Sequence, residues 1–534
     1  MPLSYITTAN GLLAFDWAVL GAYFALIVIS GIWFARKKQR STDDYFKGSS
    51  KLPSWAVAVS IVATSLSAAT FLGVPESSYT GDLTYLSTNL GMILAALVIA
   101  FLFIPVFYRH NVGSIYELLD HRYGPGASKA ASAAFLLGRL LASGARLYLI
   151  AIPLTLILYG TETELSLASV GTSVAVVTFV GILYTLIGGI TSVIWTDVVQ
   201  YCVLVGAGIA AVILVVSRLD VPMHEIFDTL AKGSNGASKL RVINTGLDPK
   251  LPFTLGTALI GFTVLGIGSY GTDQDLAQRM LTCKNARAGS RSVITGILLG
   301  IPTVAVFLLV GLALWIYYQH PDFLDRPPTQ LASDDSRKTF LVFIMSEMPA
   351  GMTGLMIAGL FAAGLSSVNS AMNAMSAAFI NDFYRPALPD KPPEHYVHAG
   401  RIGVVLFGTL LGMFALLCVI WQRADREHQE SSELLNFALG VMAFAYAGLV
   451  PVFLTAILTK RGTTLSIIAA LISGFVITGL MQPAAYADSV HEQQTGLQGL
   501  FSDLLSLHFT WRLCIAAGIS FAIAAWPSGA KRDA

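Results

Sequence analysis

Residues 60–75 read SIVATSLSAATFLGVP, an apolar segment that is crowded with hydroxyl side chains and ends at Gly73 and Pro75. With its flanks it forms an apolar run over residues 54–78, long enough to cross a bilayer core, which needs roughly 20 residues. Hydroxyl side chains compete for backbone hydrogen bonds, and glycine and proline weaken a helix further. The sequence therefore predicts a membrane span that is broken near its middle.

A second span with the same weakness lies farther along the chain. The run 253–273 contains Gly256, Gly261, Gly266, Gly268 and Gly271, and it follows the first broken span by five spans. Because five is odd, duplication of a five-helix unit inserts the second copy upside down. A pair of interrupted spans at matching positions indicates the central site of a transporter. Close helix packing through small residues is the alternative for the glycine-rich span alone.

The remaining sequence predicts an all-α polytopic membrane protein with about 13 transmembrane helices. Hydrophobic residues make up 54% of the 534 residues and charged residues 12%, about half the charged fraction of a soluble domain. A net charge of +1 without a basic domain argues against a nucleic-acid partner, and no feature indicates an obligate protein partner. The apolar runs are 16–34, 54–78, 84–108, 129–160, 166–188, 191–217, 253–273, 290–318, 340–382, 398–422, 433–458, 462–481 and 505–526.

The distribution of lysine and arginine predicts the orientation in the membrane. If the N-terminus is outside, the inside loops hold about twenty of these residues and the outside loops about ten. The C-terminus then lies in the cytoplasm. The ninth run, 340–382, is longer than one span and is expected to bend or to project beyond the membrane. Because the chain ends shortly after the last run, no enzymatic tail is expected.

Four stretches, in this order over roughly residues 16–460, resemble the sodium/solute symporter family of sodium–glucose, sialic-acid and sodium-pantothenate carriers. They are Asp43–Gly48 with Leu52–Val57 and Ala63–Ala68, Gly188–Ile190 with Trp195–Asp197, Gly271–Arg279, and Leu365–Ser370. The resemblance implies a LeuT-like fold with an inverted five-plus-five repeat, the first copy over 54–217 and the second over 253–458. Residues 16–34 would form an extra N-terminal helix and residues 462–526 two extra C-terminal helices.

The resemblance also implies a sodium site between the second and ninth spans. The backbone carbonyls of Ala63, Leu66 and Ala363 and the hydroxyls of Ser366 and Ser367 match the family's sodium ligands. The chemistry fits, because an unwound helix frees carbonyl oxygens that a hard cation can use. By residue type alone, hydrogen bonds from the two serines to carbonyls of their own helix would be the favoured interpretation, and the resemblance reverses that preference.

Asp197 lies within the sixth span, where a carboxylate is costly and usually functional. In some family members the matching aspartate holds a second sodium with hydroxyls of the ninth span. Here the matching positions are Asn369 and Ser370, and the asparagine departs from that pattern. Three interpretations of Asp197 stay open, namely a second sodium site, a sodium exit path and a helix cap.

Polar residues beside the broken span are candidates for solute binding. Ser65, Ser67 and Thr70 match solute-contact positions in family members, as do Tyr85 and Asn89, which share one face of the third span. Tyr270 in the glycine-rich span is a candidate gate. Polar residues that simply pack helices together are the alternative for each of them.

Two arginines in the fourth span, Arg139 and Arg146, share a helix face. An unpaired guanidinium in the membrane is costly, so Arg146 is expected to face the cavity or a partner. Sialic-acid carriers of the family bind the solute carboxylate with an arginine on the matching helix, and a structural ion pair is the alternative. Asp275 and Arg279, spaced i, i+4, are interpreted as a solvated helical pair.

The expected function is sodium-coupled symport of a small organic solute into the cell by alternating access, across the plasma or inner membrane. The solute is a sugar, a sialic acid or another organic anion, and Na⁺ is the one cofactor implied. The ion's differential affinity for two conformations would supply the coupling. The alternative is a proton-coupled symporter of the same fold in which Asp197 carries the proton. An enzyme is disfavoured because no catalytic constellation is present.

Overall fold

The computed structural model describes residues 12–35, 48, 52–160, 166–233, 236–329, 336–426, 434–481, 504 and 506–526. Within these ranges the structure is helical, with isolated β-bridges but no strand. By length and composition, 7 described helices could cross a membrane, and a bent pair of helices adds another candidate. Shorter apolar helices cover Ala14–Ser30, Leu167–Leu183, Thr257–Thr272, Thr464–Leu480 and Phe509–Ala525. The all-α membrane architecture that the apolar runs predict is therefore confirmed.

The described elements follow one another as α1 (Ala14–Ala35), α3 (Ser54–Ser65), α4 (Ala68–Thr80), η2 (Thr84–Ser87), α5 (Thr88–Val98), η3 (Ile99–Phe103), α6 (Ile104–His110), α7 (Glu117–Tyr123), α8 (Pro125–Tyr159), α9 (Leu167–Ser217), α10 (Met223–Lys232), η5 (Thr257–Gly261), α11 (Phe262–Ile267), η6 (Gly268–Thr272), α12 (Gln274–Leu281), α13 (Ala286–Gln319), η7 (Pro321–Phe323), α14 (Ser336–Ser346), α15 (Met352–Phe379), η8 (Ile380–Tyr384), α16 (Arg385–Ala387), α17 (Pro393–Arg426), α18 (Leu434–Leu458), α19 (Thr464–Leu480) and α21 (Phe509–Ala525).

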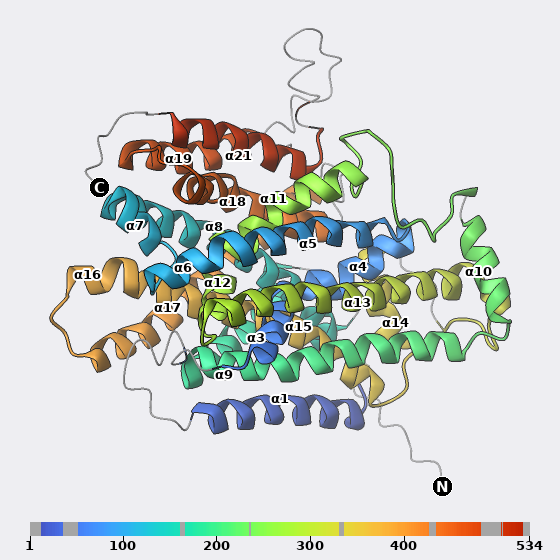
Figure 1. Cartoon of the computed structure of the whole chain (residues 1–534). Helices are drawn as coiled ribbons and strands as arrows, with labels where there is room; N and C mark the ends of the chain where they lie inside the picture. Colours follow the sequence, from blue (N-terminus) through green and yellow to red (C-terminus); the bar gives the residue numbers. More distant parts are fainter. Residues whose placement is uncertain are drawn as a thin grey trace.

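The long helices lie side by side in one bundle (Figure 1). The helix α1 packs on α9 and α15 at one edge, and α18, α19 and α21 pack on one another at the opposite edge. The central helices are α15 and α8. In the apolar stretches of the spans that contain them, 94% and 83% of the residues are buried inside the protein. Polar side chains on these two helices are thus shielded from lipid, and they must find partners within the protein.

The span that contains residues 60–75 is broken, as predicted. The helix α3 ends at Ser65, α4 begins at Ala68, and the two are bent by 65°. Leu66 and Ser67 between them have extended backbone angles, with φ/ψ of −79°/138° and −136°/178°. The backbone therefore leaves the helical path for two residues in the middle of the bundle.

The glycine-rich run 253–273 is irregular in a different way. It contains two π-helical stretches, η5 and η6, on either side of the short helix α11. The chain becomes extended at Asp273, with φ/ψ of −99°/120°, and α12 follows at once. π-Helical turns are rare and occur frequently at functional sites. The second interruption thus lies at the end of its run.

One expected boundary agrees with the structure and another differs from it. The runs 166–188 and 191–217 meet at a kink within α9, where Gly189 has a non-helical φ/ψ of 57°/−170°, so the two runs form two helical segments. The long run 340–382 is not one bent span but two helices, α14 and α15, separated at Pro349 and at Gly351, whose φ is 84°. Hydropathy detects the apolar character of this run but not the positive φ of Gly351.

The C-terminal end of α4 is held by a buried lysine from the segment after α10. Lys239, 3% exposed, donates from Nζ to the carbonyl oxygens of Ser78 at 3.3 Å and of Tyr79 and Gly81 at 2.8 Å. Its Nζ also lies 4.9 Å from the centre of the Trp315 ring. The last carbonyls of a helix lack helical partners and carry a negative partial charge. These hydrogen bonds from Lys239 therefore stabilise the C-terminal end of α4.

Replacing Lys239 by methionine is expected to lower the free energy of unfolding by about 1–3 kcal/mol, because it leaves buried carbonyls without donors. Thermal denaturation of the purified protein measures the effect. The matched control is Lys232→Met, which removes an exposed lysine from α10. Equal stability of the two variants would contradict the assigned contact.

The same contact has a pH dependence with a defined sign. Burial lowers the pKa of Lys239 from 10.5 to about 8. Between these values the unfolded chain holds a proton that the folded chain has released. The lysine's contribution to the free energy of unfolding therefore rises with pH in this window. The stability difference between the wild type and Lys239→Met is expected to widen from about pH 7.5 to about pH 9.5.

Candidate functional site

The break frees two backbone carbonyls in the first half of the broken span. In a continuous helix the Ala63 carbonyl would accept from the Ser67 amide, and the Leu66 carbonyl from the Thr70 amide. Here the Ser67 amide donates to Thr70 Oγ1 at 3.3 Å, and the Thr70 amide donates to the Ser67 carbonyl at 2.8 Å. Ala63 and Leu66, both buried, thus present carbonyl oxygens without their helical partners.

The paired serines of α15 face this break. The Ser366 hydroxyl lies 3.0 Å from the Ala63 carbonyl oxygen and 3.1 Å from the Ala363 carbonyl oxygen, and both are acceptors for it. Ser367, the next residue, accepts a hydrogen bond from Arg146 Nη1 at 2.8 Å. The sequence-predicted residues Ala63, Ala363 and Ser366 therefore meet across the bundle, while Ser367 is bonded to an arginine of α8.

Asp197 of α9 lies in the same region but has other partners. Its Oδ2 accepts from Ser60 Oγ at 2.5 Å, from Thr64 Oγ1 at 3.4 Å and from Arg279 Nη2 at 3.1 Å. Neither Asn369 nor Ser370 is bonded to it among the described residues. The Ser370 hydroxyl donates to Asp275, and the side-chain amide of Asn369 has no hydrogen-bond partner in the part of the chain that is described. The structure thus brings Asp197 to α3 and α12 rather than to α15.

Asp275 and Arg279 are buried, which corrects the expectation of a solvated pair. Each is 1% exposed, and Arg279 Nη1 donates to Asp275 Oδ1 at 2.6 Å. Asp275 also accepts from Arg139 of α8, which lies 3.3 Å from Asp273 as well. The i, i+4 spacing predicted the pair correctly, but spacing along one helix carries no information about the helices that cover it.

Together these residues form a buried ion network at the N-terminal end of α12, defined here as Arg139, Asp197, Asp273, Asp275 and Arg279. It joins α8, α9 and α12, and it reaches α3 through Ser60, α15 through Ser370 and α18 through Tyr446, whose hydroxyl donates to Asp273 at 2.8 Å. Buried charges need partners at short range. The network therefore links six helices close to the break between α3 and α4.

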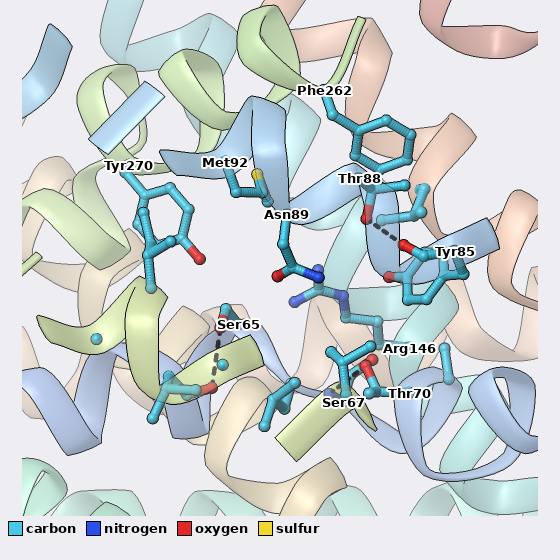
Figure 2. Close-up of a pocket in the computed structure, with 18 residues that line it drawn as sticks. Ser65, Ser67, Thr70, Tyr85, Thr88, Asn89, Met92, Arg146, Phe262 and Tyr270 are labelled. Atoms are coloured by element: carbon cyan, nitrogen blue, oxygen red, sulfur yellow. Dashed lines mark hydrogen bonds between the residues drawn. The ribbon is translucent and has the colours of Figure 1, made fainter. Parts of the chain in front are cut away.

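A pocket adjoins the break and contains every residue that the sequence assigns to the solute (Figure 2). Its lining includes Ser65, Ser67, Thr70, Tyr85, Asn89, Arg146 and Tyr270. Several of the polar groups are partly satisfied within their own helices, since Ser65 Oγ donates to the Val62 carbonyl at 2.9 Å and Asn89 Nδ2 to the Leu86 carbonyl at 3.0 Å. The pocket thus has polar groups from α3, η2, α4, α5 and η6, and Arg146 of α8 is the cation in its lining.

Arg146 is the charged group of this pocket. It is 6% exposed, and its side chain reaches into the pocket (Figure 2). Its two hydrogen bonds among the described residues go to Ser367 Oγ at 2.8 Å and to the Met442 sulfur at 3.1 Å, while Nε has no partner. No described carboxylate lies within ion-pair distance, in contrast to Arg139 on the same helix. Arg146 is therefore a buried cation that has no carboxylate partner among the described residues.

Several lining residues were missed from the sequence. Thr88, Met92 and Phe262 line the pocket, and Met442 contacts Arg146 from α18. Met92 and Phe262 are apolar side chains without a distinguishing signal, although Phe262 lies in the glycine-rich run, and only Thr88, one residue before Asn89, carried a polar signal. Met442 lies far away in the sequence, so only the packing of α18 against α8 could reveal it.

Sequence comparison relates the chain to transporters. Residues 45–474 match the Sodium:solute symporter family. A sodium/sialic acid symporter of Proteus mirabilis is 30% identical over 462 residues, which are 86% of this chain and 88% of the relative. The human sodium/iodide cotransporter is 28% identical over 74% of this chain and 60% of its own length. The mouse sodium-coupled monocarboxylate transporter 1 is 28% identical over 87% of this chain and 72% of its own length.

Structural comparison gives the same picture. A Na⁺-coupled sialic acid symporter, solved in a substrate-bound outward-open state, superposes with a TM-score of 0.76 at 26% identity, over 96% of this chain and 97% of its own. The nucleobase-cation-symport transporter Mhp1 superposes with a TM-score of 0.53 at 15% identity, over 90% of this chain and 94% of its own. The second likeness concerns the fold alone.

Proposed function

Because the chain belongs to the sodium:solute symporter family, we propose that it carries one class of small organic anion across a membrane together with sodium, by alternating access. It is a multi-pass membrane transporter and not an enzyme. The finer assignment has three parts, which are the ion site, the charge of the solute and the cycle. Each draws support from a different set of contacts.

The sodium site is assigned to the oxygens that surround the break. Its ligands are the carbonyls of Ala63, Leu66 and Ala363 and the hydroxyls of Ser366 and Ser367. The observation that carries the proposal is the 3.0 Å contact between Ser366 Oγ and the Ala63 carbonyl, because it brings a hydroxyl of α15 to a carbonyl freed by the break. Unwound backbone carbonyls coordinate sodium in transporters of this architecture.

An anionic solute is assigned to the pocket because of Arg146. A guanidinium in a dry environment needs an anion or several acceptors, and Arg146 has one hydroxyl and one thioether sulfur. A carboxylate accepts two parallel hydrogen bonds from a guanidinium. Ser65, Ser67, Thr70, Tyr85, Asn89 and Tyr270 would contact the rest of the solute. Sialic acids and small monocarboxylates, which relatives carry according to their names, are the first candidates.

The cycle follows from the proposed repeats. Residues 54–217 and 253–458 would form the inverted copies, with 16–34 and 462–526 as additional helices, in a LeuT-like arrangement of about 13 spans. The N-terminus would lie outside and the C-terminus in the cytoplasm, as the basic loops indicate. Sodium would hold α3 against α15 and complete the pocket in the outward-facing state. Separation of these helices would then release both cargoes inside.

Asp197 has a narrower role in this proposal than the sequence left open. A second sodium between Asp197, Asn369 and Ser370 would require Asp197 to leave Arg279 and Ser370 to leave Asp275. We therefore assign Asp197 to the buried ion network, beside the path by which sodium leaves. In the alternative of a proton-coupled symporter, Asp197 would carry the proton, and uptake would follow pH in the absence of sodium.

Replacing Ser367 by alanine is expected to weaken the sodium activation of uptake without preventing membrane insertion, because one hydroxyl ligand is lost. The solute is first identified as the candidate that raises the denaturation temperature of the purified protein in NaCl. The measurement is then the sodium concentration that gives half-maximal uptake of this solute into proteoliposomes. We expect this concentration to rise at least about tenfold, which corresponds to about 1.4 kcal/mol.

The matched control for this variant lies on the same helix. Ser376 of α15 is buried and donates to the Gly400 carbonyl at 2.6 Å, away from the break. Ser376→Ala is expected to keep the sodium dependence of the wild type. Unchanged sodium dependence in Ser367→Ala would count against the ligand set, and uptake without any sodium would favour the proton-coupled alternative.

A further inference from the structure

We infer that Arg146 couples the two cargoes: its charge opposes sodium at Ser367 until a solute anion neutralises it. The inference rests on the proposed function and adds a residue that makes the affinity of each cargo depend on the other. It starts from the position of the guanidinium, which belongs to the solute pocket and to the sodium site at once.

The contact between the two sites is direct. Arg146 Nη1 donates to Ser367 Oγ at 2.8 Å, and Ser367 is a proposed sodium ligand. A sodium ion bound to that oxygen would lie within a few ångströms of the guanidinium, in surroundings where Arg146 and Ser367 are 6% and 1% exposed. Like charges at this range repel strongly when water does not screen them. The free arginine is therefore an electrostatic obstacle to sodium.

No carboxylate in the described part of the chain forms an ion pair with Arg146. The other buried arginines around the break are bonded to carboxylates, Arg139 to Asp275 and Arg279 to Asp275 and Asp197. Arg146 has no described carboxylate within 4 Å and has an unpaired Nε. An acid placed beside it would have cancelled its effect on sodium. Because Arg146 has no carboxylate partner among the described residues, an anion that binds to it can change the affinity of the sodium site.

The charge balance of this region supports the same conclusion. The buried charged residues of α8, α9 and α12, with Asp273 at the start of α12, are Arg139, Arg146, Arg279, Asp197, Asp273 and Asp275. Their formal charges sum to zero. A monoanion bound alone would leave an excess negative charge in the membrane interior, and sodium bound alone an excess positive charge. Both together restore neutrality, and buried net charge is costly.

The coupling must be reciprocal. If the anion tightens sodium binding by some factor, sodium tightens anion binding by the same factor. A residue that only shapes the pocket would change solute affinity and leave the affinity for sodium alone unchanged or weaker. Coupling through charge predicts the opposite change in sodium affinity. Removing the charge of Arg146 should strengthen sodium binding when no solute is present.

The test is the sodium affinity of purified full-length Arg146→Met without solute. It is read as the NaCl concentration that gives half of the maximal rise in denaturation temperature, with choline chloride keeping the ionic strength constant. We expect this concentration to fall at least about tenfold relative to the wild type. Arg146→Lys keeps the charge and should remain close to the wild type. Arg401→Met, which removes an exposed arginine of α17, should equal the wild type.

Wild-type protein provides a second measurement if Arg146→Met does not fold. Pyruvate and N-acetylneuraminate, as sodium-free choline salts, are added to the same titration, and an anion that binds should lower the half-maximal NaCl concentration. If sodium stabilised the wild type and Arg146→Met bound sodium equally well or more weakly, the coupling role of Arg146 would be overturned. The proposed function would still stand. If sodium stabilised neither protein, the sodium site itself would be wrong.

Discussion

Replacing Asp275 by asparagine is expected to destabilise the protein by about 3–5 kcal/mol, the usual cost of removing one partner from a buried ion pair. Asp275 accepts from Arg139, Arg279 and Ser370, which come from three different helices. Asparagine keeps the size of the side chain but offers no charge. Arg139 would then keep only Asp273, at 3.3 Å. Unfolding by heat or detergent measures the loss.

A double-mutant cycle separates the ion pair from other effects of the substitution. The variant Arg139→Met, Asp275→Leu removes both charges, while Arg279 keeps its contact with Asp197. We expect this double variant to be more stable than the sum of Arg139→Met and Asp275→Leu predicts, since no guanidinium is left unpaired and Asp273 keeps its hydrogen bond from Tyr446. A destabilisation below about 1 kcal/mol in Asp275→Asn would mean that the pair behaves like an exposed one.

Replacing Arg146 by glutamine is expected to raise the solute concentration for half-maximal uptake by about 30-fold or more, as follows when a buried charged contact worth about 2–5 kcal/mol is lost. Glutamine can still donate hydrogen bonds but carries no charge for a carboxylate. The measurement is uptake into proteoliposomes at saturating sodium. The maximal rate should fall much less than the affinity.

Two comparisons control this prediction. Arg401→Gln on the exposed face of α17 should transport as the wild type does. A neutral analogue of the solute, in which an amide replaces the carboxylate, should be carried poorly by the wild type and with little further loss by Arg146→Gln. If the variant discriminated against the neutral analogue as strongly as the wild type, Arg146 would not be the anion contact.

The sequence predicted the helical architecture and the broken span because both depend on local composition. Apolar runs identify membrane helices through their length, and the hydroxyl-rich stretch before Gly73 and Pro75 signalled the break between Ser65 and Ala68. The candidate solute residues also proved to line one pocket. The segment that contains residues 36–47, with part of the first family stretch, lies outside the described residues.

The buried ion network was not predictable in the same way. The spacing of Asp275 and Arg279 indicated that the two side chains meet, but their burial depends on α3, α8, α9 and α15 packing around α12. Arg139 and Asp275 are far apart in the sequence, and a single sequence holds no signal that pairs them. Asp197 likewise joins Arg279 instead of Asn369, because distant helices decide which of several polar neighbours comes within reach.

The bend between α3 and α4 places both poles of a helix at one point inside the membrane. The final turn of α3 presents the negative end of its dipole, and the first turn of α4 presents the positive end, at fixed positions and without ionisable groups. Opposite partial charges side by side suit a salt better than a lone ion. Because these partial charges belong to the main chain, side-chain substitutions can change which solute is recognised while the main-chain charges stay in place.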